Sequence, residues 1–345
     1  TYSNDWIYFP LLLFCWLPIL YFSRVTSIPE YFGKRFNSKV RFWATVCLMV
    51  YMIGYVGVNL FTMGKVLHHL LGWDIFIGAV IVALVSMSYV SSGGQTSVIM
   101  TDLFQGVMLL VTGGLILGLG FAYLGGFDVF WNNLPGDSRK VFHNFNDPGF
   151  PSVGIFWQDG LANSIMFGFL HQGTIMRYMS ARSFKDCKKA VVTHLVVLMP
   201  LAACVVGGAG WLAKALANHG DLPASMPADE SFYAATQLIS QPGIFGLILA
   251  AMIAALMSTV DTLITAISAV WVNDVHKLYI KKDMTDRQAL TVARFTAIGA
   301  TVVGIILVPV FMNFDSIYDA HGAFTAAVTP PLVVTFIFSV FWKRF

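Results

Sequence analysis

Charged residues are scarce in this chain. Asp, Glu, Lys and Arg make up 11% of the 345 residues, whereas hydrophobic residues make up 57%. A soluble domain carries roughly 25% charged residues, so the composition excludes a soluble protein and predicts a multi-pass membrane protein. The 30 glycines fit this class, because small residues allow helices to pack closely in lipid.

Cysteine is scarce as well, and the four cysteines lack metal-binding spacing. We interpret them as packing residues rather than disulfide partners: Cys15, Cys47, Cys187 and Cys204. Basic residues occur only in short scattered clusters, which excludes a nucleic-acid-binding surface. An initiator methionine and a signal peptide are also missing, and the chain stops at the edge of an expected helix. We therefore expect it to be part of a longer protein.

Long apolar runs are abundant. A helix needs about 20 apolar residues to cross a bilayer, and nine runs qualify: 6–24, 43–71, 76–91, 98–124, 152–177, 188–217, 243–271, 289–312 and 319–342. Most lysines and arginines follow spans one, five, seven and nine, which places these span ends in the cytoplasm. The longer loops after spans four and six then face outside.

The fifth span is interrupted by polar residues. The segment ANSIMFGFLHQGTIMRY (162–178) mixes amide, hydroxyl and imidazole side chains with Gly168 and Gly173. Broken, polar backbone at membrane depth is tolerated only inside protein or against a cavity, and in transporters it lines the substrate site. A kinked packing helix is the alternative, because glycine is common in membrane helices.

The seventh span carries a polar stripe in AALMSTVDTLITAIS (254–268). On a helix, one face holds Ala255, Ser258, Asp261, Thr262, Thr265 and Ser268. A single hydroxyl is commonly explained by a bond to its own helix backbone, but this does not explain a carboxylate, which costs roughly 2.5–3.5 kcal/mol at membrane depth. Oxygen ligands gathered on one face suit a hard cation such as sodium.

A second carboxylate, Asp102, lies just inside the fourth span, after a Gly-Gly pair in YVSSGGQTSVIMTD (89–102). One interpretation is an acid stabilised by the dipole at the start of a helix. Together with Asp261 in the same helix bundle, an ion or proton pathway is favoured.

Five ordered segments resemble motifs of the sodium/solute symporter family, the sodium/glucose cotransporter-like proteins. They are VTSIPEYFGKRF (25–36), YVSSGGQTSVIMTD (89–102), HQGTIMRYMSARS (171–183), AALMSTVDTLITAISAVWVNDVHK (254–277) and AAVTPPLVVTFIFSVFWKRF (326–345). Gln95, His171 and Met176 depart from the family pattern. The resemblance covers essentially the whole chain.

The resemblance implies an all-α integral membrane fold, a five-plus-five inverted repeat of helices. The nine spans then correspond to core helices two to ten, with the first core helix missing. Residues 1–345 form a single transporter domain, in which 1–150 hold the rest of the first repeat and an external loop, and 151–345 the second repeat. Without the first core helix, we expect the chain alone not to transport.

The resemblance also implies sodium sites. The family's common sodium site maps to the backbone oxygen of Ala255 and the hydroxyls of Ser258 and Thr259. A second site, present in some members, maps to Asp102, Asp261 and Thr262 together with Ser258. Because members usually carry a small residue at position 261, the extra carboxylate either strengthens sodium binding or binds a proton, and two close carboxylates need not both ionise.

Substrate contacts follow from the resemblance only approximately. Asn163, Ser164 and Phe167 lie near the family's sugar-contacting and gating positions in the sixth core helix. Asp5 lies near an acidic contact in the second, and His321 near a polar contact in the tenth. These matches identify no particular solute.

The sequence therefore predicts a secondary active transporter, not an enzyme: Na⁺-coupled symport of a small organic solute, with sugars or polyols favoured, by alternating access. Two alternatives stay open. One is a proton-coupled symporter. The other is the solute-sensing module of a signalling protein, which a kinase-like domain beyond Phe345 would favour. An intramembrane aspartyl protease is disfavoured because neither aspartate lies in a Gly-x-Gly-Asp motif. We expect location in the cell (plasma or inner) membrane, lipid contacts and no obligate protein partner.

Overall fold

The fold is built from helices. The computed structural model describes residues 5–139, 152–157, 163–223 and 225–342, and these ranges contain no strand. Within them six helices are long and apolar enough to cross a membrane, or seven if a bent pair near the N-terminus counts as one span. This confirms an all-helical protein with several membrane spans, while the count of nine stays a prediction.

The first half of the chain forms the elements α1 (Asp5–Leu11), η2 (Leu12–Trp16), α2 (Leu17–Ser23), α3 (Ile28–Arg35), α4 (Ser38–Leu71), α5 (Ile75–Leu124), α6 (Phe127–Asn133), η3 (Gly136–Arg139) and α7 (Ser152–Ile155). The second half forms η5 (Met166–Leu170), α8 (Gln172–Met179), α9 (Phe184–Thr193), η6 (His194–Leu198), α10 (Met199–Ala202), η7 (Ala203–Gly207), α11 (Gly208–His219), α12 (Ala228–Ile239), α13 (Pro242–Val270), η8 (Trp271–Ile280), α14 (Asp286–Phe311) and α15 (Ile317–Phe341).

The N-terminal span turns sharply into α3. Arg24 ends α2 with φ of 52°, and the axis bends by 82° before α3. Ser27 caps α3 by accepting a hydrogen bond from the backbone N–H of Glu30, as serine commonly does at a helix start. The motif segment 25–36 is therefore a capped turn and short helix that joins two spans.

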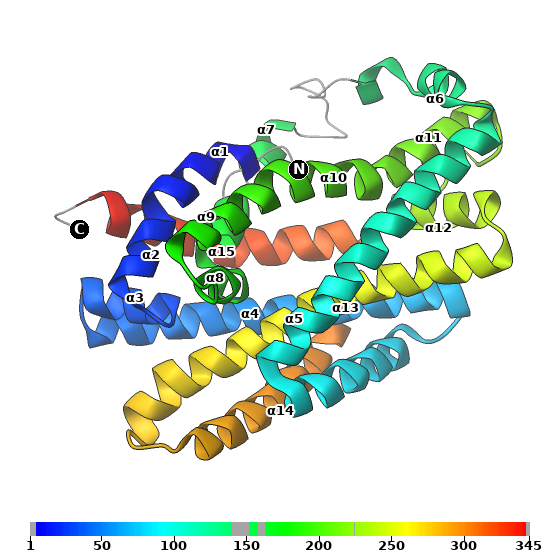
Figure 1. The fold of residues 1–345 in the computed structure, drawn as a ribbon. Helices are drawn as coiled ribbons and strands as arrows, with labels where there is room; N and C mark the ends of the chain where they lie inside the picture. Colours follow the sequence, from blue (N-terminus) through cyan, green and yellow to red (C-terminus); the bar gives the residue numbers. More distant parts are fainter. Residues whose placement is uncertain (1–4, 140–151, 158–162, 224, 343–345) are drawn as a thin grey trace.

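The third and fourth predicted spans lie in one element, α5, which breaks at Gly94. This residue has φ of 62° and ψ of −157°, and Figure 1 shows the change of direction along α5. The Gly-Gly motif therefore divides α5 into two helical segments without a separate loop.

Helix α13 lies at the centre of the main bundle, packed against α4, α5, α8 and α14. A second, smaller apolar cluster joins α6, α11 and α12 to the C-terminal part of α5. The four cysteines are free thiols, in agreement with the expectation that they form no disulfide, but Cys47 and Cys204 are exposed, so the packing interpretation fits only Cys187 and in part Cys15. The seventh predicted span thus contributes to the packing of most of the bundle.

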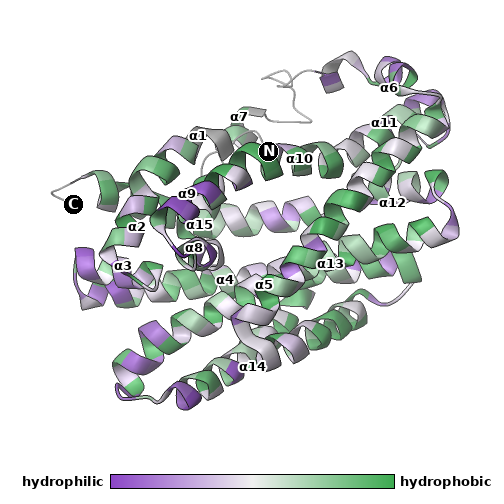
Figure 2. Ribbon diagram, in the orientation of Figure 1, coloured by the Kyte–Doolittle hydropathy of each residue, from purple (hydrophilic) through white to green (hydrophobic). Residues whose placement is uncertain are grey.

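Polar residues gather at the ends of the long helices. Apolar residues cover most of each long helix in Figure 2, and hydrophilic residues concentrate around α3 and the turn between η8 and α14. Both of these segments lie on the left of the view, opposite α6 and α12 (Figure 1). This distribution places two of the predicted basic loops at one end of the bundle, while their cytoplasmic orientation stays a prediction.

We expect Gly94→Ala to destabilise the protein by about 1–3 kcal/mol, because its backbone conformation is open essentially to glycine alone. The cost is conformational rather than steric, since an added Cβ would meet nothing within 4 Å. Thermal unfolding in detergent measures it. Gly106→Ala is the matched control, because it adds a methyl to a helical position of α5 that also has open space. An unchanged melting temperature in Gly94→Ala would contradict the prediction.

Candidate functional site

The polar residues of α13 lie at different depths. Asp261 is 0% exposed and Thr262 is also buried, whereas Ala255, Ser258 and Thr259 are half-buried. The apolar residues of the opposite face are buried too. The helix is therefore enclosed on both faces near Asp261, instead of presenting one open polar face.

The hydroxyls of α13 bond to their own helix. Ser258 donates to the carbonyl oxygen of Ala255 at 2.7 Å, Thr262 to that of Ser258 at 2.8 Å and Ser268 to that of Ile264 at 2.8 Å. Such bonds satisfy a hydroxyl inside a helix. Each hydroxyl oxygen keeps lone pairs as well, so these bonds leave it able to accept a hydrogen bond or to ligate a cation.

Asp102 pairs with Arg177, which was not among the predicted site residues. The guanidinium of Arg177, on α8, forms an ion pair with Asp102 and also donates to the hydroxyl of Thr262. Asp102 and Thr262, predicted to share a sodium site, are therefore brought together by an arginine. The sequence analysis missed Arg177, and the Met176–Arg177 part of the family motif was the signal that could have identified it.

Asp261 lies apart from this network. Its Oδ2 accepts a hydrogen bond from the hydroxyl of Tyr89 on α5. Successive residues on a helix point about 100° apart, so Asp261 and Thr262 meet different neighbours. The predicted grouping of Asp102, Asp261 and Thr262 is thus divided between two places.

The fifth predicted span is broken, as its glycines and polar residues indicated. His171 lies between η5 and α8 with an extended backbone, and its Nδ1 accepts from the N–H of Thr174 at 3.2 Å. The ring of Phe167 stacks on that of His171, with centroids 4.6 Å apart. The next residue, Gln172, accepts from the N–H of Ile28 at 2.9 Å, which ties the break to the turn before α3.

The predicted substrate residues lie on three elements. Asn163 and Ser164 are half-buried just before η5, and Phe167 is 36% exposed. His321 on α15 has its Nε2 3.0 Å from the hydroxyl of Tyr55 on α4. Asp5 begins α1, and its side chain lies outside the described residues.

Two of these elements, α1 and α15, contact the broken helix at η5. Tyr8 of α1 packs so closely on Gly168 of η5 that an added Cβ there would meet its ring, and α15 also contacts η5. The structure therefore brings α1 and α15 to the broken helix. His321 is held against α4 through the hydroxyl of Tyr55.

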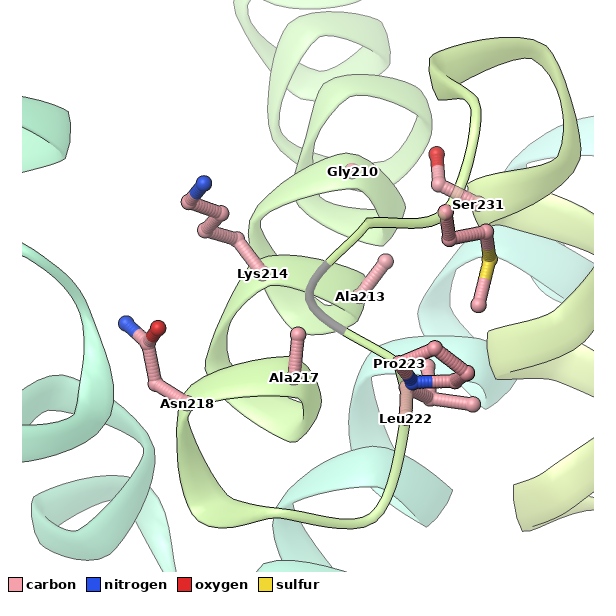
Figure 3. Close-up of a pocket in the computed structure, with 9 residues that line it drawn as sticks. Gly210, Ala213, Lys214, Ala217, Asn218, Leu222, Pro223 and Ser231 are labelled. Atoms are coloured by element: carbon pink, nitrogen blue, oxygen red, sulfur yellow. The ribbon is translucent and has the colours of Figure 1, made fainter.

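One cavity is lined by residues within 210–231, none of which is a predicted sodium or solute residue. It has a volume of about 230 Å³ and lies between α11 and the segment leading into α12. Figure 3 shows Ala213 and Ala217 on its α11 side and Leu222 and Pro223 on the segment opposite. Since none of the predicted sodium or solute residues lines it, this cavity adds nothing to the candidate site.

Comparison with known proteins identifies the family of this chain. The family description "Sodium:solute symporter family" matches residues 4–345. The chain belongs to this family. The predicted resemblance is thereby confirmed, and so is sodium as the coupling ion at the level of the family. The family and a solved structural neighbour are transporters rather than enzymes, and the apolar helices make this chain part of a multi-pass membrane protein.

The curated relatives of this symporter chain are distant in sequence. It is 26% identical to a sodium/glucose cotransporter of Vibrio parahaemolyticus over 95% of the chain and 64% of the relative. It is 24% identical to the sodium/sialic acid symporter NanT of Aliivibrio fischeri, over 100% of the chain and 71% of the relative. The human sodium/myo-inositol cotransporter is also 24% identical, over 99% of the chain and 53% of the relative. The chain thus spans roughly half to three quarters of the length of these relatives.

A solved structure shares the symporter fold. It is a Na⁺-coupled sialic acid symporter in a substrate-bound outward-open state, with a TM-score of 0.83 and 22% sequence identity. The match covers 99% of this chain and 72% of the other. At this identity the likeness establishes the fold.

We expect Arg177→Gln to destabilise the protein by about 2 kcal/mol, because it leaves the carboxylate of Asp102 without its positive partner. The cost is below that of a fully buried pair because Arg177 is 37% exposed and water screens part of the interaction. Unfolding of Arg177→Gln, Asp102→Asn and the double variant gives the coupling energy.

The double variant should recover part of the loss, since it removes both charges. Lys34→Gln is the control, because it breaks the more exposed pair with Glu30 and should cost less than about 1 kcal/mol. Purely additive single effects would show that Asp102 and Arg177 do not stabilise each other.

Proposed function

We propose that the protein carries out sodium-coupled symport of a small organic solute by alternating access. Family membership carries this proposal. Two features support it: oxygen-bearing residues in the middle of the central helix α13, and a backbone break at His171 on a neighbouring helix segment. In secondary transporters, solute and ions bind at such broken helices near the bilayer midplane.

We also propose the five-plus-five inverted repeat with nine spans in this chain. The boundary at about residue 150 places the broken segment around His171 at the start of the second repeat. Gly94 supplies the separation of spans three and four that this arrangement needs. The TM-score of 0.83 to a Na⁺-coupled symporter supports the same overall fold.

The common sodium site is proposed at Ala255, Ser258 and Thr259. Ser258 and Thr259 offer half-buried hydroxyl oxygens at the middle of α13, and Ala255 offers a carbonyl oxygen that already accepts from Ser258. Sodium is a hard cation and takes hydroxyl and carbonyl oxygens. A sodium ion here would hold this turn of α13 against whichever element completes its shell.

A second sodium ion at Asp102 and Thr262 would have to displace the guanidinium of Arg177. That guanidinium already supplies positive charge to both side chains, although Asp102 Oδ1 is buried without a hydrogen-bond partner. We therefore propose that Arg177 serves as the cation at Asp102 and fixes the position of Thr262.

The solute is proposed to be a sugar or polyol that binds near the broken helix. Glucose, myo-inositol and sialic acid occur in the names of the relatives, and all carry several hydroxyl groups. The half-buried Asn163 and Ser164 can bond to hydroxyls, and the Phe167–His171 stack can cover a sugar ring. Asp5 and His321 stay proposed contacts from the neighbouring helices, and the cell membrane stays the proposed location.

We expect sodium to raise the melting temperature of the full-length protein relative to potassium or choline, because a ligand that binds the native state stabilises it by mass action. At a sodium concentration of about 100 Kd the gain is about 2.7 kcal/mol for one site. Ser258→Ala should lose most of the gain. Differential scanning fluorimetry in detergent, at constant ionic strength, measures it.

Ser339→Ala is the matched control for Ser258→Ala. Ser339 is a buried serine of α15 whose hydroxyl bonds to the carbonyl oxygen three residues earlier at 2.7 Å, as that of Ser258 does. It should keep the full sodium response. A sodium response that Ser258→Ala and Ser339→Ala retain equally would move the common site off α13, and the absence of any response would refute sodium coupling.

A further inference from the structure

Asp261 is a buried carboxylate without a counter-charge. Its side chain lies in the interior of the bundle, 0% exposed, and no ion pair within the described part of the chain includes it. Asp102 and Asp274, by contrast, are paired with Arg177 and Arg41. Because an unpaired charge in a low-dielectric interior is strongly unfavourable, Asp261 is the carboxylate for which the protein itself supplies no cation.

The polar groups near the carboxyl of Asp261 are hydroxyls. Tyr89 donates its hydroxyl hydrogen to Oδ2, which leaves the lone pairs of the phenol oxygen free to point elsewhere. Ser86 lies one turn before Tyr89 on α5, hence on the same face of that helix, with its side chain near the carboxyl of Asp261.

Two of these oxygens are incompletely used. Asp261 Oδ1 and Ser86 Oγ are both buried without a hydrogen-bond partner of ordinary geometry, and Ser86 is 0% exposed. Buried polar atoms normally have partners. Two unsatisfied oxygens that belong to facing side chains therefore mark a place where a ligand with positive charge would fit.

Two arginines on the surrounding helices are paired with other carboxylates. On α8, Arg177 contacts Asp102 of α5 and Thr262, and on α4, Arg41 contacts Asp274 of η8. Tyr51 and Tyr55 of α4 pack on Phe324 of α15. On α14, Arg294 lines a cavity.

That cavity, of about 350 Å³, borders the Asp261 cluster. It is lined by Val90 and Ser91, which directly follow Tyr89 on α5, and by Thr265 and Ser268, one and two turns beyond Asp261 on α13. Arg294 is its one charged lining residue and is exposed. A cavity that includes several hydroxyl groups thus approaches within about one helical turn of Tyr89 and Asp261.

We propose that Ser86, Tyr89 and Asp261 form a sodium site between α5 and α13, distinct from the site at Ser258 and from the Asp102–Arg177 pair. Carboxylate, phenol and hydroxyl oxygens suit a hard monovalent cation. The described residues hold no group of three or more His, Cys, Asp or Glu side chains, so ions that require such clusters are not favoured. The ion supplies the charge that Asp261 lacks, and only its role in coupling rests on the proposed symport.

Equilibrium binding of radioactive sodium to the purified full-length protein tests the proposal without transport. Wild type is expected to bind at least two ions, and Asp261→Asn to lose one. Ser258→Ala should lose a different one, so the double variant Ser258→Ala/Asp261→Asn should lose both. Ser86→Ala keeps the charge and should weaken the Asp261 site by about tenfold, whereas Ser339→Ala should bind as wild type does.

The melting temperatures of wild type and Asp261→Asn in choline show whether the variant still folds. Without sodium this variant should melt no lower than wild type, because asparagine removes an uncompensated buried charge; with sodium the order should reverse. If Asp261→Asn and Ser86→Ala both retain the wild-type number and affinity of ions, the proposal is overturned. Loss of the second ion in Asp102→Asn but not in Asp261→Asn would also overturn it. An unchanged ion count in Ser258→Ala alone would refute the proposed common site and leave the Asp261 site standing.

Discussion

The need of a buried carboxylate for a positive partner organises this helix bundle. Water is absent from the interior of the membrane, so each negative charge there must be compensated by the protein or by an ion. Asp102 obtains an arginine from the broken segment, and Asp274 obtains one from the start of α4. Asp261 obtains only hydroxyl groups. The distribution of internal cations therefore separates structural carboxylates from one that suits a mobile ion.

Those ion pairs also connect parts of the fold that are distant in sequence. Arg177 follows the backbone break at His171, so the pair with Asp102 attaches this broken segment to α5, while the contact with Thr262 attaches it to α13. At the start of α8, the same helix that holds Arg177, Gln172 bonds to the turn before α3. The helix that follows the interruption, α8, is thus held near both of its ends by polar contacts to other elements.

Much of this architecture was accessible from the sequence, because bilayer thickness and the cost of buried charge act directly on residue patterns. The long apolar runs, the broken fifth span and the importance of α13 followed from such local signals. The partner of Asp102 did not, because Arg177 lies at the boundary between an apolar run and a basic loop. The separation of Asp261 from Thr262 also escaped the helical-face argument, because neighbouring residues on one stripe can contact different helices once the bundle packs.

The location of Asp261 has a consequence for coupling. A cation bound between Tyr89 and Asp261 would contact both α5 and α13. A cation bound by Ser258 and Thr259 would take these two ligands from α13 alone. An ion can shift a conformational equilibrium only by binding one state more tightly than another. An ion that bridges two helices is sensitive to their separation, because its ligands come apart when the helices do. The α5–α13 contact is therefore the place in this bundle where ion binding would depend most directly on helix movement.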